Sequence, residues 1–379
     1  AAGSGMSRSK GSDVVIIGAG VAGCATAYYL AREGVRATII EREGIASKAS
    51  GFSAGGLNPL QGAVIPGPLG PLAIKSFRMH QEIWPELLES GVDFEPETIS
   101  VVAVAYKESQ VASMEETHRI FSEADDDFKS TWLDADQIRE MEPRLSSGAI
   151  RGLSAYGNAT LSSYRYVLAL VKTVEKMGAT VKSSNVIGVK TDGSRVTSVV
   201  LERGEIACES VVFATGPWSD QVESWLNVKI PVEPLKGEML RMSLGDQPRL
   251  DRDYQGFGVT LNHREEGQVW IGATEMRKGF DDTPSAEARD VLMGGALKLM
   301  PALADAKLVL HTACLRPVTR DWLPIVGLAP GWDNAYLATG AGKKGILLSP
   351  GMGEAVAGLI TSGSLDSEME RFKPDRFID

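Results

Sequence analysis

The stretch Asp13-Val14-Val15-Ile16-Ile17-Gly18-Ala19-Gly20-Val21-Ala22-Gly23 decides the fold. An apolar, β-branched run typical of a buried parallel strand leads into three glycines spaced GxGxxG, and an amphipathic helical pattern follows them. Gly18 permits a sharp turn, Gly20 lets the backbone approach a pyrophosphate, and Gly23 lets the helix pack against the strand. The free N–H groups and the positive end of that helix are expected to bind the phosphates of a dinucleotide.

A second strand, predicted over residues 37–40, completes a βαβ unit and is followed by Glu41. A carboxylate about twenty residues after the glycines is placed to accept hydrogen bonds from ribose hydroxyls. Glu41 disfavours NADP, whose 2′-phosphate it would repel, but it does not separate NAD from FAD. The alternative interpretation of the glycines, a packing turn without a ligand, does not account for the acid at this spacing.

Composition and charge exclude several classes of function. The chain has 379 residues and a formal net charge of −10, so the phosphates of nucleic acid would be repelled. The chain has an odd number of cysteines, namely Cys24, Cys208 and Cys314. This number argues against a disulfide framework and for a reducing, cytoplasmic compartment. The four histidines show no HxxxH or HxH spacing, so no metal site is expected. Residues 1–5 read as a cloning remnant before Met6.

The rest of the chain mixes helical and antiparallel patterns. Residues 46–71 are rich in Gly, Ser and Pro and almost uncharged, and a loop of that length is usually functional. Antiparallel strands are predicted over residues 231–243 and 258–274, and Asp192-Gly193 is a hairpin signal. The last long helix is predicted over residues 350–360. Apart from the glycine-interrupted apolar run that opens the chain, no stretch approaches the length of a membrane span.

Three further motifs lie downstream of the glycine-rich turn. They are ASGFSAGGL at residues 49–57, VVFATGPWS at residues 211–219, and LRPVTRDWLPIVG at residues 315–327, which pairs with GAGKKGILLSP at residues 340–350. Together with the N-terminal fingerprint through Glu41-Arg42, they resemble the D-amino-acid oxidase superfamily of FAD-dependent oxidoreductases, and within it the glycine oxidase and sarcosine oxidase branch. The resemblance extends from Asp13 to about Ile360.

The resemblance implies an α/β fold, α+β overall, in which a Rossmann-type FAD-binding domain carries an inserted antiparallel-sheet substrate domain. The FAD-binding domain is expected at residues 11–92, 147–231 and 317–379. The substrate domain is expected at residues 93–146 and 232–316, with the isoalloxazine ring between the two domains.

The same resemblance assigns the residues that bind FAD. Small residues in the 49–57 loop let the backbone lie close to a flat ring. A helix starting near Pro350 would direct its N-terminus at the pyrimidine edge and stabilise the negative charge that appears there on reduction. Lys343 and Lys344 would add to this effect, with a solvated loop pair as the alternative. The residues assigned to the cofactor are Gly18, Gly20, Gly23, Glu41, Arg42, Ser50, Ser53, Gly55, Gly56, Leu57, Val186, Thr215, Gly216, Trp218, Cys314, Lys344, Gly345, Ile346 and Leu347.

Arg316 is the residue assigned to the substrate carboxylate, because it matches the arginine that glycine-oxidase-like enzymes use as a clamp and because a guanidinium binds a carboxylate bidentately. The alternative is a structural ion pair with a residue such as Asp321. The family's His-Phe-Arg-Asn segment is Ala341-Gly342-Lys343-Lys344 here, and Thr260 takes the place of a substrate-binding tyrosine, with His263 close by. The site is therefore expected to be roomier than one built for glycine. Arg316, Lys343, Thr260 and His263 are the predicted catalytic residues.

Two positions bear on the flavin chemistry. Cys314 stands where the sarcosine and pipecolate oxidase branch carries a cysteine bonded to the flavin, and the alternative for it is a small buried residue in a strand. Trp270 replaces the lysine that sarcosine oxidases use to activate oxygen. Oxygen and a quinone-type compound both stay open as acceptors.

The expected reaction is oxidation of an amino acid or N-substituted amino acid by hydride transfer to the flavin, giving an imine that hydrolyses. One alternative is dehydrogenation of a 2-hydroxy acid, with a base such as His263, or of glycerol phosphate. Another is a flavin subunit of a dye- or quinone-linked dehydrogenase complex. A homo-oligomer is also compatible with the sequence.

Overall fold

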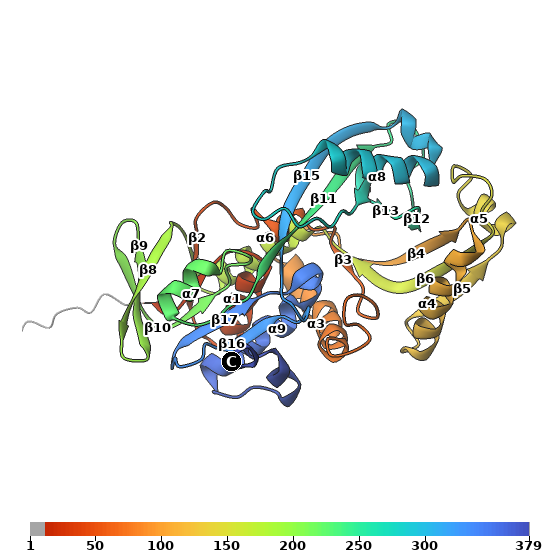
Figure 1. Cartoon of the computed structure of the whole chain (residues 1–379). Helices are drawn as coiled ribbons and strands as arrows, with labels where there is room; N and C mark the ends of the chain where they lie inside the picture. Colours follow the sequence, from red (N-terminus) through yellow and green to blue (C-terminus); the bar gives the residue numbers. More distant parts are fainter. Residues whose placement is uncertain (1–11, 379) are drawn as a thin grey trace, which may run out of the picture.

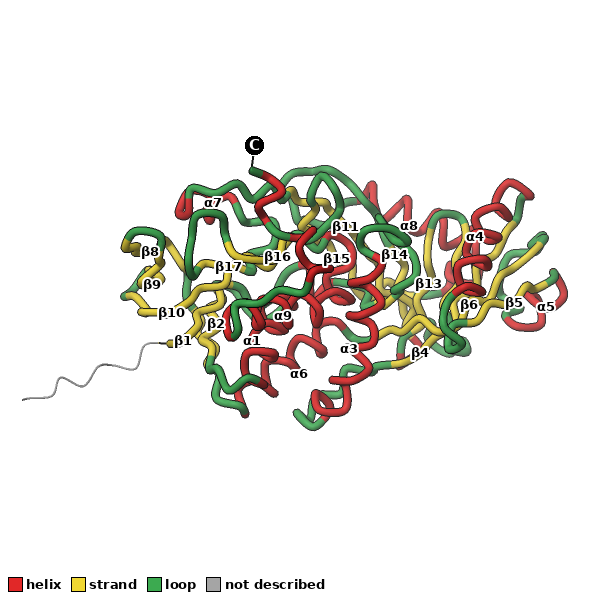
Figure 2. The backbone as a smooth tube through the Cα atoms, turned by 90° about the horizontal axis from the view of Figure 1, so that it is seen from below, coloured by secondary structure: helices red, strands yellow, loops and turns green. Residues whose placement is uncertain are grey.

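The computed structural model describes residues 12–378 and consists of two β-sheets with helices packed on both (Figure 1). The predicted cloning remnant, residues 1–5, lies outside the described residues. The two sheets occupy opposite halves of an elongated molecule, and a view turned by 90° shows the same separation (Figure 2).

The first sheet contains the nucleotide-binding fingerprint. Its central strands run parallel, and they come from the beginning, the middle and the end of the chain. A hairpin that turns at the predicted Asp192-Gly193 extends from it. In spatial order the strands are β16 (Ile325–Leu328), β17 (Ala335–Thr339), β10 (Glu205–Phe213), β1 (Ser12–Ile17), β2 (Ala37–Glu41) and β7 (Thr180–Ser183), with β8 (Val186–Asp192) and β9 (Arg195–Leu201) forming the hairpin.

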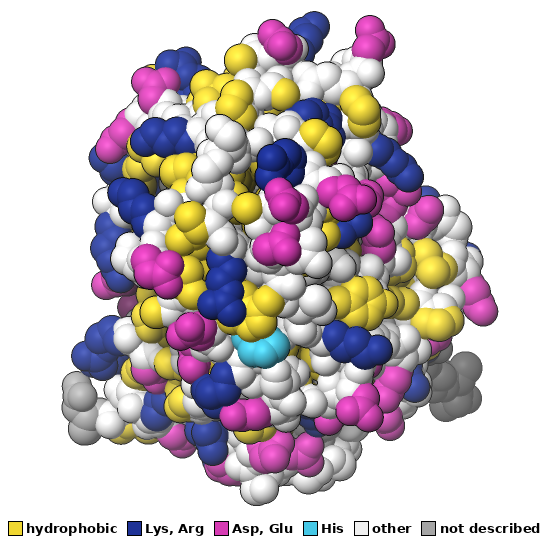
Figure 3. Space-filling model, turned by 90° about the vertical axis from the view of Figure 1, so that its right-hand side faces the viewer, with side chains coloured by type: hydrophobic (Ala, Val, Ile, Leu, Met, Phe, Trp, Pro, Cys, Tyr) yellow, Lys and Arg dark blue, Asp and Glu magenta, His cyan; other side chains and the backbone are white. Residues whose placement is uncertain are grey.

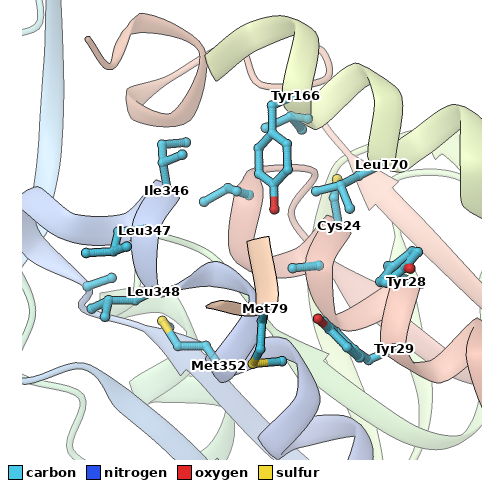
Figure 4. Packing of buried hydrophobic residues seen from close by; sticks show 14 of the residues in the cluster. Cys24, Tyr28, Tyr29, Met79, Tyr166, Leu170, Ile346, Leu347, Leu348 and Met352 are labelled. Carbon is cyan, nitrogen blue, oxygen red and sulfur yellow. The ribbon is translucent and has the colours of Figure 1, made fainter. Parts of the chain in front are cut away.

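Four helices lie on one side of this sheet and bury the largest hydrophobic core. They are α1 (Val21–Arg32), α3 (Gly70–Leu88), α6 (Ser163–Lys176) and α9 (Gly345–Thr361), with α3 packed on α6 and α9. Figure 4 shows Tyr28 of α1, Tyr166 of α6 and Met352 of α9 converging there. The helices α1 and α9 can approach closely because Gly353 has no side chain. A Cβ at this position would lie 2.7 Å from the Ala25 carbonyl carbon. The opposite face is covered by α7 (Asp220–Leu226) and the last turn of the chain.

The second sheet is largely antiparallel. Only β4 and β12 pair in parallel among its strands within residues 12–378. In spatial order the strands are β15 (Lys307–Val318), β11 (Glu233–Ser243), β14 (Gln268–Gly272), β13 (Val259–His263), β12 (Asp253–Gly256), β4 (Glu97–Ala105), β6 (Arg151–Thr160) and β3 (Gly56–Leu57), and β5 (Lys129–Leu133) pairs with β6. This arrangement confirms the predicted fold class, a Rossmann-type unit with an antiparallel second sheet.

Three helices cover the second sheet. The helix α8 (Ala286–Leu299) packs over β11, β13 and β14, while α4 (Val111–Glu123) and α5 (Ala135–Met141) lie at the outer end near β5 and β6 (Figure 1). Leu261, Ile271 and Leu299 are fully buried between them. Within residues 12–378, no helix is both long enough and apolar enough to cross a membrane.

Several elements differ from their predictions. The last long helix begins at Gly345, five residues before the predicted start, so Pro350 lies inside α9. The predicted loop over residues 46–71 contains a short helix, α2 (Ala49–Phe52), the strand β3 and the start of α3. The predicted domain range 147–231 includes β6, which hydrogen-bonds in the second sheet.

Candidate active site

A cavity of about 480 Å³ lies between the carboxyl ends of β1, β10 and β17 and one face of β11 and β15. Its volume falls in the usual range for small-molecule sites. Open α/β sheets bind their ligands outside the carboxyl ends of parallel strands, so the position is the one expected for a nucleotide. The cavity therefore joins the nucleotide-binding sheet to the second sheet.

The glycine-rich turn at one end of this cavity requires glycine at two positions. Gly18 has a φ of 110°, and a Cβ there would lie 2.2 Å from the Ala214 carbonyl oxygen. A Cβ at Gly23 would lie 2.1 Å from the Gly18 carbonyl oxygen. The amide of Val21, in the first turn of α1, donates a hydrogen bond to Ser50 Oγ at 3.0 Å. The turn thus presents glycine backbone at the start of a helix, beside the hydroxyl group of Ser50.

Glu41 holds this turn from the end of the neighbouring strand. Its Oε2 atom accepts a hydrogen bond from the Ala19 amide at 2.8 Å. Farther along the same wall, the Arg42 guanidinium lies 5.2 Å and the Lys48 ammonium 5.5 Å from the centre of the Trp218 ring. Val186 lines the same end of the cavity.

The segment after β10 is fixed to the end of β17. Gly216 has a φ of 58°, and its carbonyl oxygen accepts a hydrogen bond from Thr339 Oγ1 at 3.0 Å. The hydroxyl groups of Thr215 and Ser219 lie 3.1 Å apart. Thr215, Gly216 and Trp218 all line the cavity from this segment.

The N-terminus of α9 meets the cavity at Gly345 and Ile346. The Ile346 carbonyl oxygen lies 2.8 Å from His80 Nε2, and Trp84 Nε1 donates to His80 Nδ1 at 3.3 Å. Burial lowers the pKa of His80 to about 4, so its ring is neutral and Nε2 is the protonated nitrogen that donates to Ile346. The positive end of the α9 dipole is thereby held at the cavity wall.

The two adjacent lysines before α9 point to different places. Lys343 Nζ lies in the cavity wall, 2.6 Å from Glu275 Oε1 and 5.4 Å from the centre of the Trp322 ring. Lys344 is outside the lining, and its ammonium donates to the carbonyl oxygens of Asn58 and Gln61 at 2.9 and 2.7 Å. Burial lowers the pKa of Lys344 to about 8. The structure thus places Lys344 as a tether of the loop around residues 58–61.

Arg316 faces the cavity from β15. Its Nη1 atom donates to the Thr274 carbonyl oxygen at 3.1 Å, and no carboxylate in residues 12–378 lies within ion-pair distance of its guanidinium. Asp321, the alternative partner, accepts instead from Arg376 Nε at 2.8 Å. A Cβ at Gly237, on the neighbouring strand, would lie 2.2 Å from Arg316 Nη2. Glycine at residue 237 therefore leaves the space that the guanidinium occupies.

Two cavity-lining residues, Gly237 and Glu275, are not among the predicted site residues. A glycine inside a strand pattern is a known sign of close approach and was available as a signal for Gly237. Glu275 carried no local signal, because nothing in the sequence places it beside Lys343.

Thr260 and His263, two of the predicted catalytic residues, are not among the cavity-lining residues. The His263 ring lies between Asp253 Oδ1 at 2.5 Å from Nδ1 and Glu97 Oε2 at 3.3 Å from Nε2. Burial opposes protonation of the ring, but the hydrogen bond and charge of Asp253, with the charge of Glu97, outweigh it and raise the pKa of His263. Both ring nitrogens are therefore engaged by carboxylates outside the cavity.

Cys314 lines the cavity beside Arg316. Burial raises the pKa of its thiol, and the charge of Arg316 offsets only part of that rise, so the thiol is protonated near neutral pH. A covalent bond from Cys314 to the flavin stays a prediction.

Most predicted site residues are brought together in this one cavity, and the others lie behind its wall or away from it. Those that line it are Gly18, Gly20, Glu41, Arg42, Ser50, Ser53, Gly56, Val186, Thr215, Gly216, Trp218, Cys314, Arg316, Lys343, Gly345 and Ile346. Those that do not are Gly23, Gly55, Leu57, Thr260, His263, Lys344 and Leu347.

The residues present fit FAD. The side-chain-free turn at Gly18 and Gly20 suits a pyrophosphate, and the carboxylate of Glu41 suits a ribose. Small residues of the 49–57 segment and the start of α9 suit a flat ring that gains negative charge. The cavity continues from there to Arg316, where a second, anionic molecule can bind.

Comparison with known proteins gives a consistent result. Residues 13–359 match the family model described as FAD dependent oxidoreductase, DAO. A glycine oxidase of Pseudomonas aeruginosa is 29% identical over 357 residues, covering 92% of this chain and 94% of that protein. The bifunctional protein ThiO/ThiG of Synechocystis sp. is 30% identical over 376 residues, covering 97% of this chain and 54% of that protein.

Solved structures agree with these relatives. The crystal structure of glycine oxidase from Geobacillus kaustophilus superposes with a TM-score of 0.88 at 27% identity, covering 97% of this chain and 99% of that one. Iminodiacetate oxidase from Chelativorans sp. BNC1 shares the fold, with a TM-score of 0.87 at 23% identity and coverage of 95% and 98%.

Proposed function

This chain belongs to the DAO family of FAD-dependent oxidoreductases, and on that basis we propose that it oxidises an amino acid or N-substituted amino acid whose carboxylate binds to Arg316. The observation that carries the proposal is an arginine without an acidic partner, among the described residues, in the same cavity as the dinucleotide-binding turn. The similarity to glycine oxidases supports the same class of substrate.

The electrostatics of Arg316 favour an anionic substrate. A guanidinium in a cavity loses part of its hydration, and a carboxylate that binds bidentately restores the lost interactions. The hydrogen bond to the Thr274 carbonyl oxygen and the space above Gly237 fix the orientation of the group. A carboxylate held in this way has its α-carbon at a fixed distance from the wall formed by the start of α9.

Each part of the site then has a role. Bound FAD supplies the acceptor for the hydride that leaves the α-carbon or N-alkyl carbon. The glycine-rich turn holds the phosphates, and the N-terminus of α9 stabilises negative charge near Gly345 and Ile346. Loss of a hydride from the neutral amine leaves an iminium, which reacts with water to give an oxo-acid and ammonium, or an aldehyde and an amine. This chemistry needs no side-chain base, and His263 is engaged elsewhere.

The lining favours a substrate larger than glycine. Ala273, Ala341 and Gly342 line the cavity together with Arg316, and none of these three has a bulky side chain. We infer that these residues leave room for a side chain or an N-substituent. Oxygen or a quinone-type compound would serve as the final electron acceptor.

Anaerobic mixing of the FAD-loaded protein with matched ligands tests the proposal. The panel contains glycine, larger amino acids of both configurations, N-methyl amino acids, and the amide of each, which lacks the carboxylate. We expect one or more of the acids to bleach the flavin absorbance while the matching amide does not. If no amino acid bleaches it, and lactate or glycerol phosphate does, the substrate assignment is wrong.

A further inference from the structure

A second cavity, of about 400 Å³, lies on the other side of the segment that lines the flavin site. Ala46, Ser47 and Phe52 line both cavities, so the segment that contains them lies between the two. The remaining walls are the first turn of α6, the turn η2 (Glu265–Gly267), and side chains from β11, β14 and the end of β13.

Two arginines and a tryptophan form the floor of this second cavity. Arg241 of β11 stands directly opposite Trp270 of β14 in the sheet register. The guanidinium carbons of Arg241 and Arg264 lie 4.0 and 4.6 Å from the centre of the Trp270 ring. Contacts of this kind stabilise a cation, but they leave the N–H groups of the guanidinium free to donate.

The two arginines differ in how their charge is compensated. Arg264 donates to the carbonyl oxygens of His263 and Ala54, and the charges of Asp253 and Glu95 act on it. The guanidinium of Arg241 makes no hydrogen bond and no ion pair with any residue between 12 and 378. Burial lowers the pKa of Arg241, and no neighbouring carboxylate opposes this effect. A partly buried, uncompensated cation is costly and is a sign of a ligand site.

Exposed arginines elsewhere in the molecule behave differently. On the outer helices, Arg119 pairs with Glu116 and Glu123, and Arg139 pairs with Asp136. Figure 3 shows the same intermixing of basic and acidic side chains over that face of the surface. Arg241 therefore differs from these exposed arginines, because its guanidinium has no acidic partner among the described residues.

The other charged groups of the second cavity do not neutralise Arg241. Glu95 pairs with Arg165 at 2.7 Å. Glu265 and Glu266 are exposed on the η2 turn. The first turn of α6, residues 162–165, contributes the positive end of a helix dipole to the same cavity.

We propose that this second cavity binds a small anion, a carboxylate or a phosphate, through the guanidinium of Arg241 beside Trp270. The anion lies against the 46–52 segment, opposite the flavin, and is distinct from the substrate carboxylate at Arg316. The proposal does not depend on which substrate the enzyme oxidises.

The test is a binding measurement on FAD-loaded protein that carries Arg316→Met, so that the first anion site is removed. Inorganic phosphate and malonate are the probes, and isothermal titration calorimetry is the readout. We expect saturable binding of at least one probe at one site, a loss of tenfold or more in affinity with Arg241→Met, and a smaller loss with Arg241→Lys, which keeps the charge. The probe that binds more tightly identifies the source of the anion, a phosphate or a carboxylate.

The matched control is Arg289→Met, because Arg289 is exposed on α8 and pairs with Asp290. Affinity equal to that of the parent is expected for this variant. The proposal is overturned if neither probe binds saturably, or if Arg241→Met and Arg241→Lys bind as tightly as Arg289→Met. Because the readout is binding and Arg316 is already replaced, failure here leaves the proposed amino-acid oxidation untouched.

Discussion

The two ends of the main cavity are built in different ways. The nucleotide end is centred on one continuous βαβ unit, in which the Ala19 amide of the glycine-rich turn donates a hydrogen bond to the carboxylate of Glu41. The proposed substrate end is assembled from separate strands and loops that bring Gly237, Glu275, Arg316 and Lys343 together. The difference shows that a short sequence can encode a nucleotide site, whereas a substrate site depends on the assembled second sheet.

The largest effect is expected from Gly18→Ala at the nucleotide end. Its Cβ would lie 2.2 Å from the Ala214 carbonyl oxygen, and its φ is positive. The variant should lose about 4 kcal/mol of unfolding free energy and its FAD affinity. Gly34→Ala is the control, because Gly34 has a φ of 75° but no described atom lies within 4 Å of its Cβ position. It should cost about 1 kcal/mol, measured by denaturant unfolding. Equal losses would show that close packing at Gly18 is unimportant.

At the substrate end, Gly237→Ala should displace the guanidinium of Arg316, because the two would overlap. We expect kcat/KM for carboxylate substrates to fall by about 10²-fold, as a small misplacement of a binding group does. The FAD affinity should stay within about twofold, since the change is far from the glycine-rich turn. Gly188→Ala, in the open strand β8, is the control. A matching loss of FAD affinity would mean that the two ends are not independent.

The burial of Lys344 is expected to make the stability of the protein depend on pH. The pKa of Lys344 is about 8 in the folded protein, below its ordinary value of 10.5. Protons therefore bind the unfolded chain more tightly, and the penalty for burying the charge is present below pH 8 and is relieved as the pH rises toward 10.5. Between pH 7 and 9.5 the parent should gain about 2 kcal/mol relative to Lys344→Met in urea unfolding. A constant difference between the two curves would contradict the buried, charged lysine.

The smallest effect is expected from Glu275→Gln. It removes a half-exposed negative charge from the cavity and frees Lys343. An ion pair of this exposure contributes about 0.5–1 kcal/mol, so kcat/KM for carboxylate substrates should rise about threefold. Glu233→Gln, which breaks the exposed pair with Arg277, should leave kcat/KM unchanged. A fall in kcat/KM with Glu275→Gln would instead place Glu275 among the groups that bind the substrate.

The same contrast explains what the sequence could predict. The helical pattern predicted after the glycines is confirmed, because α1 begins at Val21, directly after Gly20. The predicted start of the last helix at residue 350 is wrong, because α9 begins at Gly345 and Pro350 lies inside its first turns. The strand β6 escaped prediction, and with it the assignment of residues 151–160 to the second sheet.

At the site, the sequence does not predict the direction in which a side chain points. Lys343 and Lys344 are adjacent and identical in the sequence, yet one lines the cavity and the other binds the loop around residues 58–61. The two carboxylates that contact His263 could not be predicted from the sequence, because Asp253 and Glu97 belong to two other strands. Local pattern gives the element on which a residue lies, and tertiary packing decides which side chain reaches the ligand.

The central claim is that Arg316 anchors the substrate carboxylate, and anaerobic reduction kinetics of Arg316→Met test it most directly. The matched control is Arg320→Met, which removes an exposed arginine on the same segment, outside the cavity lining. With the best amino-acid substrate, we predict that Arg316→Met lowers the ratio of the reduction rate constant to the substrate Kd by about 10²–10³-fold. The flavin spectrum and FAD affinity should match those of Arg320→Met. Reduction by Arg316→Met as efficient as by Arg320→Met would contradict the claim.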